Sequence, residues 1–267
     1  MKSIKKIILS MICLSLVILS VSCKNKDGKT NTSEASKVEN NELLIGAAAS
    51  LTDAFNEIKP IFEEKENCKL NFNFAASGTL QKQVEEDGGL DVFVSASEDK
   101  MNKLIEQDLI IKDTVFPVLK NGLVLITNKD MKESINMENF VDISNKIAIG
   151  QPDVVPAGQY AKQTLENKDI WDKVEGKLVF AKDVRAVLAY VSSGECEAGF
   201  VYKSDAIIDE NVKIAEEVGE DLHDPIVYPG GVVKSSKAVK LSQKFLDFLK
   251  EDESKEILKK YGFLVND

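Results

Sequence analysis

Short apolar runs alternate with segments of helical periodicity along most of this chain, and this alternation constrains the fold more than any other feature. In residues 70–74, large apolar side chains alternate with asparagines, which is the period of two typical of a strand. In residues 52–66, four apolar side chains recur at the spacing of one helical face. The pattern predicts an α/β fold with mostly parallel sheets, because strands separated by helices of this length pair through crossovers.

The two periodicities give a set of expected elements. The predicted strands are residues 43–48, 70–74, 91–95, 123–127, 146–150, 178–180 and 199–202, and the predicted helices are residues 52–66, 79–86, 98–107, 157–166 and 183–191. The folded part has about 225 residues, which exceeds the commonest size of a single domain. The sequence therefore predicts two lobes.

The N-terminus has the features of a secretory signal peptide. Lysines precede an apolar stretch at residues 7–21 that is too short for a confident membrane span, and a small residue then precedes Cys23. We predict that residues 1–22 are a lipoprotein signal peptide, that Cys23 becomes the lipidated first residue, and that residues 23–41 are a polar tether. The alternative is an ordinary signal peptide with Cys23 incidental, since Ser20 stands where lipoprotein signals usually have an apolar residue.

The charge balance and the scarcity of two residue types exclude several kinds of site. The chain has 44 acidic and 34 basic residues and a net charge of −10, and removal of residues 1–22, with three lysines and no acid, makes it −13. His223 is the only histidine and Arg185 the only arginine. Histidine-based catalysis needs an orienting partner, zinc needs a cluster of ligands, and an acidic surface repels nucleic acid. We therefore predict no histidine-based catalysis, no direct site for a metal cation and no nucleic-acid partner.

Four predicted strand-to-helix junctions share small, hydroxyl or carboxylate residues. They are residues 47–53, 75–80, 155–160 and 182–186. The first turn of a helix has backbone N–H groups without an internal partner and the positive end of the helix dipole, so it binds anions without a basic side chain. The alternative is that these serines and aspartates are ordinary N-caps, which any α/β protein contains. The junctions alone leave anion binding open.

A series of motifs runs in order from about Leu43 to Phe263. They are Ala47-Ala48-Ala49-Ser50-Leu51 with Ala54-Phe55, Phe74-Ala75-Ala76-Ser77-Gly78-Thr79-Leu80, Asp91-Val92-Phe93-Val94-Ser95-Ala96, Val155-Pro156-Ala157-Gly158-Gln159-Tyr160-Ala161, Asp183-Val184-Arg185, Gly199-Phe200-Val201-Tyr202-Lys203-Ser204-Asp205-Ala206 and Tyr261-Gly262-Phe263. As a set they resemble the molybdate-binding proteins of ABC importers, a family of periplasmic-type oxyanion-binding proteins.

This resemblance implies a two-lobed fold like that of periplasmic binding proteins. Each lobe would be a mostly parallel sheet flanked by helices, with the ligand in the cleft between the lobes. Lobe 1 would span residues 43–119 plus 226–267, and lobe 2 would span residues 120–225. Crossing segments near Leu119 and Val227 would act as the hinge.

The resemblance also implies that a tetrahedral dianion is bound by neutral donors. Carried onto this sequence, the ligand-binding groups are the hydroxyl and N–H of Ser50 and Ser77, the N–H of Ala157 and Val184, and the phenolic hydroxyl of Tyr202. All of these except Tyr202 lie at the helix starts described above.

Charged residues near these motifs are assigned structural roles. Asp153 and Asp183 are expected to be turn or helix-start carboxylates. Arg185 is expected to be an ion-pair partner rather than an anion clamp.

The residues and the resemblance together predict a monomeric, extracytoplasmic substrate-binding protein that is not an enzyme and has no cofactor. It would be anchored as a lipoprotein to the outer face of the cell membrane, capture molybdate or tungstate, and deliver it to an ABC permease. Three alternatives stay open: the same fold tuned to sulfate or another tetrahedral oxyanion, an enzyme with Ser50 or Ser77 as nucleophile, and a sensor lipoprotein without a transporter. The enzyme is disfavoured because no Ser-x-x-Lys stands at either serine.

Overall fold

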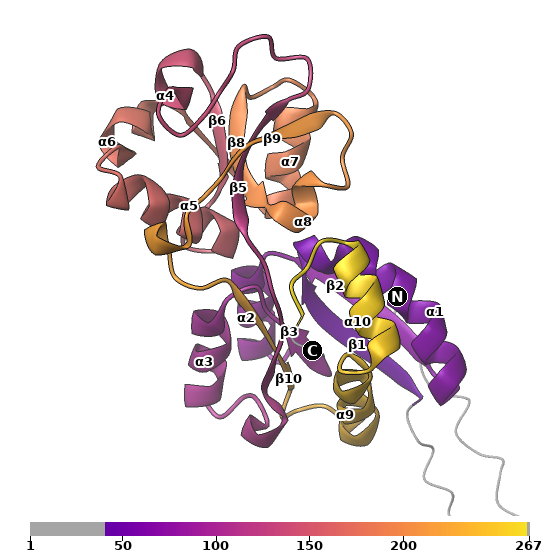
Figure 1. The fold of residues 1–267 in the computed structure, drawn as a ribbon. Coiled ribbons are helices and arrows are strands. Elements are labelled where there is room, and N and C mark those ends of the chain that lie inside the picture. Colours follow the sequence, from indigo (N-terminus) through magenta and orange to yellow (C-terminus); the bar gives the residue numbers. More distant parts are fainter. Residues whose placement is uncertain (1–40, 266–267) are drawn as a thin grey trace, which may run out of the picture. The chain divides into compact units, whose positions relative to one another are not determined.

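Two separate five-stranded sheets are built from the residues 41–265 that the computed structural model describes (Figure 1). These residues belong to one compact unit. The first sheet has the order β2 (Lys69–Ala75), β1 (Glu42–Ala48), β3 (Val92–Val94), β10 (Val227–Val232), β4 (Phe116–Lys120). The second has the order β7 (Leu178–Ala181), β6 (Ile147–Gly150), β8 (Ala198–Tyr202), β5 (Leu123–Asn128), β9 (Val212–Glu217). We call each sheet with its helices lobe 1 and lobe 2. The predicted signal peptide, Cys23 and nearly all of the tether lie outside the described residues.

One strand in each sheet runs against the other four. In lobe 1, β1 pairs in parallel with β2 and β3, whereas β10 is antiparallel to β3 and β4. In lobe 2, β6 pairs in parallel with β7 and β8, whereas β5 is antiparallel to β8 and β9. Each reversed strand is the first one after the chain crosses between the sheets: β5 follows β4 of the first sheet, and β10 follows β9 of the second. The predicted fold class, mostly parallel sheets in an α/β protein, is confirmed.

Helices cover both faces of each sheet. In lobe 1, Figure 1 shows α2 and α3 on one side of the sheet and α1 with α10 on the other, and in lobe 2 it shows α5 and α7 on opposite sides. The helices are α1 (Thr52–Glu66), α2 (Ser77–Glu85), α3 (Glu98–Glu106), α4 (Phe140–Ile143), α5 (Pro156–Asn167), α6 (Trp171–Val174), α7 (Val184–Ser192), α8 (Lys203–Ala206), α9 (Val239–Phe248) and α10 (Asp252–Lys260), with single 3-10 turns η1 (Ala49–Leu51), η2 (Lys112–Thr114), η3 (Glu175–Lys177) and η4 (Glu220–Leu222).

The periodic apolar positions of the sequence form the core. Phe55 and Phe62 of α1 are fully buried and make edge-to-face contacts with Phe245 of α9, at centroid distances of 5.8 and 5.3 Å. In lobe 2 the corresponding contact joins Phe140 and Phe200. Aromatic pairs of this kind add to the free energy gained from burying their area. In lobe 1 they hold α1 against α9, and in lobe 2 they hold α4 against β8.

Two segments cross between the lobes and lie side by side. One is residues 121–122, between β4 and β5, and the other is residues 218–226, between β9 and β10. The N–H of Asn121 donates to the carbonyl oxygen of Ile226 at 3.1 Å, which ties the two crossings together. The predicted lobe boundaries and the hinge role of these segments stay predictions.

Within residues 41–265, none of the helices combines the length and the apolar character needed to cross a membrane.

Candidate ligand-binding site

A pocket lies where the strand ends of lobe 1 meet those of lobe 2, and all five residues predicted to bind the ligand line it. The lining residues are Ala48, Ala49, Ser50, Ala75, Ala76, Ser77, Ala96, Val155, Pro156, Ala157, Val184 and Tyr202. None of them carries a charge, and only the two serines and the tyrosine contribute polar side-chain atoms. The pocket therefore offers hydroxyl groups and backbone N–H groups to a ligand.

The topology explains why four distant junctions meet here. A helix follows each of β1, β2, β6 and β7, after the single turn η1 in the case of β1 and after residues 151–155 in the case of β6. The two strands of each lobe run in parallel within their sheet. Parallel strands bring their carboxyl ends to the same edge of a sheet, where α/β proteins bind ligands. The turns that follow these strands therefore line the pocket, and the first turn of a helix has N–H groups without a partner inside the helix.

The N-cap alternative holds at one junction and fails at the other three. Asp183 caps α7, since its side chain accepts from the N–H of Ala186 at 2.8 Å. The turn η1 and the helices α2 and α5 have no side-chain cap. Their first-turn N–H groups therefore depend on other acceptors. Asp153 and Asp183 are not among the lining residues, as expected.

The hydroxyl groups of Ser50 and Ser77 do not cap a helix, and each has a hydrogen-bond partner elsewhere in the fold. The Ser77 hydroxyl accepts from the N–H of Ala96 at 2.9 Å, which leaves its own proton for the pocket. Ser50 Oγ lies 2.8 Å from the hydroxyl of Tyr228, and either oxygen can be the donor in that pair. Neither partner is a lysine or a histidine, so nothing in this geometry activates a serine as a nucleophile.

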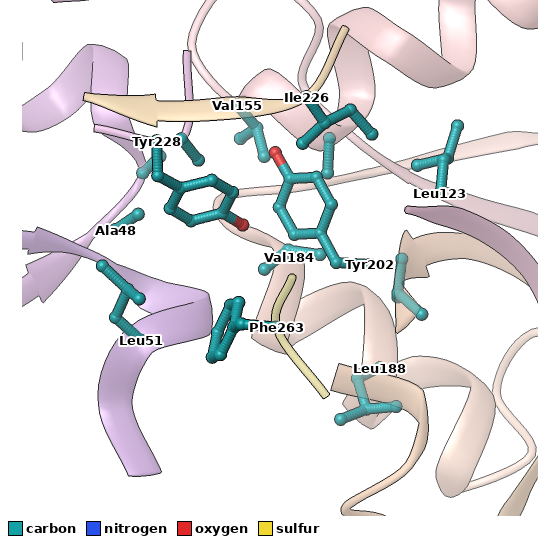
Figure 2. Packing of buried hydrophobic residues seen from close by; sticks show 14 of the residues in the cluster. Ala48, Leu51, Leu123, Val155, Val184, Leu188, Tyr202, Ile226, Tyr228 and Phe263 are labelled. Atoms are coloured by element: carbon teal, nitrogen blue, oxygen red, sulfur yellow. The ribbon is translucent and has the colours of Figure 1, made fainter. Parts of the chain in front are cut away.

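Tyr202 places a buried hydroxyl in the pocket without a partner. Its side chain is 1% exposed, and its oxygen makes no hydrogen bond with any described residue. Burial raises the pKa of this phenol well above its usual value, so the group is a neutral donor. Figure 2 shows Tyr202 beside Tyr228, and their rings meet edge to face at 5.7 Å. An unsatisfied buried hydroxyl costs about 1–3 kcal/mol, and a ligand that accepts from it removes this cost.

Arg185, the single arginine of the chain, does not line the pocket but bridges the two lobes. Arg185, on α7 of lobe 2, pairs with Asp53 of α1 in lobe 1 at 2.6 Å and donates to the carbonyl oxygen of Ser50 at 3.3 Å. Its Nε also lies 2.7 Å from fully buried Asp205, an ion pair without a well-directed hydrogen bond. Burial raises the pKa of Asp205 to about 7, although Arg185 opposes the rise. The expectation that Arg185 is an ion-pair partner is confirmed.

Three further contacts join the lobes around the pocket. The N–H of Gly78 donates to the carbonyl of Val154 at 2.9 Å. The buried ammonium of Lys100 donates to the carbonyl oxygen of Asp153 at 3.2 Å. The hydroxyl of Tyr160 donates to the carbonyl oxygen of Ala96 at 3.3 Å. The lobes are therefore in direct contact around the site.

Sequence reasoning missed several residues of this region. Ala96 lies two residues beyond the end of β3, and no role was expected for it. Tyr228 and Asn121 lie in or beside the crossing segments and carry no recognisable local pattern. Only their long-range partners reveal them.

Comparison with known proteins identifies the family. The family model described as bacterial extracellular solute-binding protein matches residues 43–264. This range contains every lining residue of the pocket and both sheets, apart from Glu42 at the start of β1.

The chain belongs to this family.

Two proteins are related to the chain in sequence, and one solved structure shares its fold. The chain is 38% identical to the "Putative ABC transporter substrate-binding lipoprotein YvgL" of Bacillus subtilis, over 97% of this chain and 98% of that one. It is 39% identical to the molybdate-binding protein ModA of Haemophilus influenzae, over 83% of this chain and 89% of that one. The periplasmic molybdate-binding protein of Azotobacter vinelandii has the same fold, with a TM-score of 0.76 at 21% identity, covering 84% of this chain and 100% of that one. The predicted resemblance is confirmed.

The described residues contain no group of three or more histidine, cysteine, aspartate or glutamate side chains placed to hold a metal cation.

Proposed function

We propose that this solute-binding protein captures molybdate or tungstate as a free dianion outside the cytoplasm and delivers it to the permease of an ABC importer. The observation that carries the proposal is the uncharged pocket, in which helix starts from both lobes surround the unpartnered hydroxyl of Tyr202. Relatives named as molybdate-binding proteins support the choice of oxyanion. The ligand-binding groups would be those of Ser50, Ser77, Ala157, Val184 and Tyr202.

Neutral donors are sufficient for tight binding of a dianion. Two serine hydroxyls, the phenol and four backbone N–H groups supply about seven hydrogen bonds, each worth about 1.5–3 kcal/mol when the acceptor is charged. Long-range attraction cannot contribute, because the acidic protein repels an anion at a distance. The affinity therefore comes from short-range donors held in place by the two lobes.

A site made of donors selects by protonation state. Molybdate, tungstate and sulfate present only acceptor oxygens, whereas hydrogen phosphate carries a proton that needs an acceptor. A buried donor facing that proton is left unpaired, which penalises the wrong ligand. The site would therefore distinguish molybdate from phosphate by protonation state. It would distinguish molybdate from sulfate by cavity size.

Calorimetry with the purified folded part tests this function. We expect tight binding of molybdate and tungstate, with sulfate and phosphate much weaker, and one ligand for each monomeric protein. Sulfate binding as tightly as molybdate would replace the proposal by a general oxyanion carrier. If none of these four anions binds, oxyanion capture is refuted.

We also propose that Cys23 carries the lipid anchor. A relative covering nearly the whole chain is named as a lipoprotein, and Cys23 follows the predicted signal peptide directly. A single acyl chain holds a protein only marginally, so stable anchoring requires more than one. In a bacterial host that lipidates proteins, the wild type is expected in the membrane fraction and Cys23→Ser in the soluble fraction or the medium. An unchanged distribution of Cys23→Ser would contradict the anchor.

A further inference from the structure

The direction of one hydrogen bond decides whether Ser50 can donate to a ligand. Ser50 Oγ and the hydroxyl of Tyr228 lie 2.8 Å apart, with both side chains buried. If Tyr228 donates, the Ser50 proton is free for the pocket. If Ser50 donates, the pocket meets a serine oxygen that can only accept, and this would repel an oxyanion.

Asn121 resolves the direction. Its Oδ1 accepts from the N–H of Gly122 at 3.0 Å, and a backbone N–H can only donate, so the amide cannot be turned over. Its Nδ2 therefore faces the other way, where it donates to Ser204 Oγ at 2.8 Å and to the Tyr228 hydroxyl at 3.3 Å.

Because Tyr228 accepts from Asn121, its own proton needs another acceptor. Ser50 Oγ, at 2.8 Å, is the other hydrogen-bond neighbour of this hydroxyl among the described residues. The reverse arrangement, with Ser50 donating, would leave the Tyr228 proton buried and unpaired on a side chain with no exposed surface. Burying such a group unpaired is costly, so Tyr228 donates to Ser50.

We propose that Asn121 and Tyr228 are positioning residues that hold the Ser50 hydroxyl as a donor to the ligand and prevent it from accepting a proton from one. This rests on the proposed function, and it assigns part of the selectivity to residues outside the pocket lining. The chain of donors begins in a crossing segment, where Asn121 contacts Tyr228 of lobe 1 and Ser204 of lobe 2. Ser77 needs no positioning residue of this kind, because its partner is a backbone N–H, which can only donate to the serine oxygen.

The consequence concerns protonated oxyanions. With Tyr228 in place, a ligand proton that faces Ser50 meets a hydroxyl already committed to donating. Without the Tyr228 hydroxyl, the Ser50 hydroxyl can rotate and accept that proton. Loss of the Tyr228 hydroxyl should therefore weaken molybdate binding and at the same time narrow the preference for molybdate over phosphate.

The test is a double-mutant cycle between Tyr228→Phe and Ser50→Ala, measured by calorimetry with molybdate and with inorganic phosphate. Tyr228→Phe keeps the buried ring and should weaken molybdate binding by about three- to tenfold, with a smaller loss for phosphate. In the Ser50→Ala background the same change should have no further effect, because Tyr228 acts through Ser50. Tyr261→Phe is the matched control, since it removes a hydroxyl that bonds Glu57 and does not line the pocket.

Asn121→Ala provides a second, independent variant. It leaves Tyr228 without its fixed donor and should weaken molybdate binding in the wild-type background but not with Ser50→Ala. The positioning role would be overturned if the losses of molybdate affinity in Tyr228→Phe and Ser50→Ala were additive. It would also be overturned if Tyr228→Phe kept the wild-type preference for molybdate over phosphate. Wild-type protein that binds no oxyanion would instead refute the proposed function, so the two failures are distinguishable.

Discussion

At the scale of single residues, the site is defined by groups whose hydrogen bonding is incomplete. The hydroxyl of Tyr202 is buried and without a partner, whereas Ser77 has its oxygen paired and its proton free. A folded protein keeps such groups at a cost in stability, and ligand-binding sites are where that cost is offset. The identity of both residues was predictable from the sequence motifs. Their unpaired state was not.

Replacing Tyr202 by phenylalanine should change stability and binding in opposite directions. The variant loses a buried hydroxyl without a partner, so the unfolding free energy of the ligand-free protein is expected to stay equal or to rise by about 1 kcal/mol. Molybdate affinity is expected to fall by about tenfold or more, because a donor is lost. Urea denaturation and calorimetry measure the two quantities. A large loss of ligand-free stability would contradict the assignment.

Asp205 should give the stability of the protein a particular dependence on pH. Its pKa of about 7 in the folded state lies above the value of about 3.9 in an unfolded chain. The folded state therefore holds an extra proton between these values, and the stability contributed by Asp205 is complete below about pH 4 and is lost as pH rises through about 7.

The substitution Asp205→Asn isolates this effect. The amide is neutral throughout, so the variant should gain stability relative to the wild type as pH increases from 4 to 8, by up to about 4 kcal/mol. Denaturation of both proteins across this range is the measurement, and parallel pH profiles would contradict the raised pKa.

At the scale of elements, the sequence periodicity predicted seven of the ten strands and five of the ten α-helices of the described residues. The helix expected at residues 52–66 is α1, because its buried face repeats at helical spacing without interruption. Strand β10 was not predicted, since its middle is Pro229-Gly230-Gly231, residues with weak strand preference. It forms because β3 and β4 pair with it on both sides. Tertiary contacts here override local preference.

The start of α2 approaches lobe 2 so closely that only glycine fits. A Cβ atom on Gly78 would lie 2.6 Å from the carbonyl oxygen of Val154. Gly78→Ala should therefore hold the lobes apart and weaken molybdate binding by about tenfold or more, while helix propensity leaves the unfolding free energy unchanged or slightly raised. Calorimetry and denaturation measure the pair of effects.

Gly158 supplies the contrast for this experiment. A Cβ atom there would lie 1.9 Å from the carbonyl oxygen of Gly150, within the same lobe. Gly158→Ala should destabilise the fold by about 1–3 kcal/mol, whatever the ligand. If Gly78→Ala behaved like Gly158→Ala, the closure interpretation would be wrong.

At the scale of the whole molecule, the contacts around the pocket join two lobes that the chain connects only by two short crossings. Domain closure around a ligand is the motion such an arrangement permits. The ion pair of Arg185 with Asp53 spans the lobes and is partly exposed, with side-chain exposures of 25% and 43%. Its contribution to closure is therefore modest.

Arg185→Gln and Asp53→Asn separate closure from electrostatics. If the ion pair stabilises the closed form, both variants should weaken molybdate and sulfate binding by the same few-fold factor. If only the local field matters, removing the negative charge of Asp53 should tighten binding of a dianion while removing Arg185 weakens it. Affinities of both variants for both anions, measured at one salt concentration, distinguish these outcomes. Tighter binding by Asp53→Asn would exclude the closure role.

The sequence by itself determined most strands, half of the helices, the uncharged chemistry of the helix starts and the family, because periodicity, composition and motifs are local properties of the chain. The tertiary structure alone decided how these parts meet. Ser50 and Tyr228 are 178 residues apart, and Arg185 is 132 residues from Asp53. Such pairs depend on sheet order and on the crossing of the chain between lobes, which no short segment encodes. The direction in which the Ser50 proton points therefore follows from the fold, although the serine itself is evident in the motif.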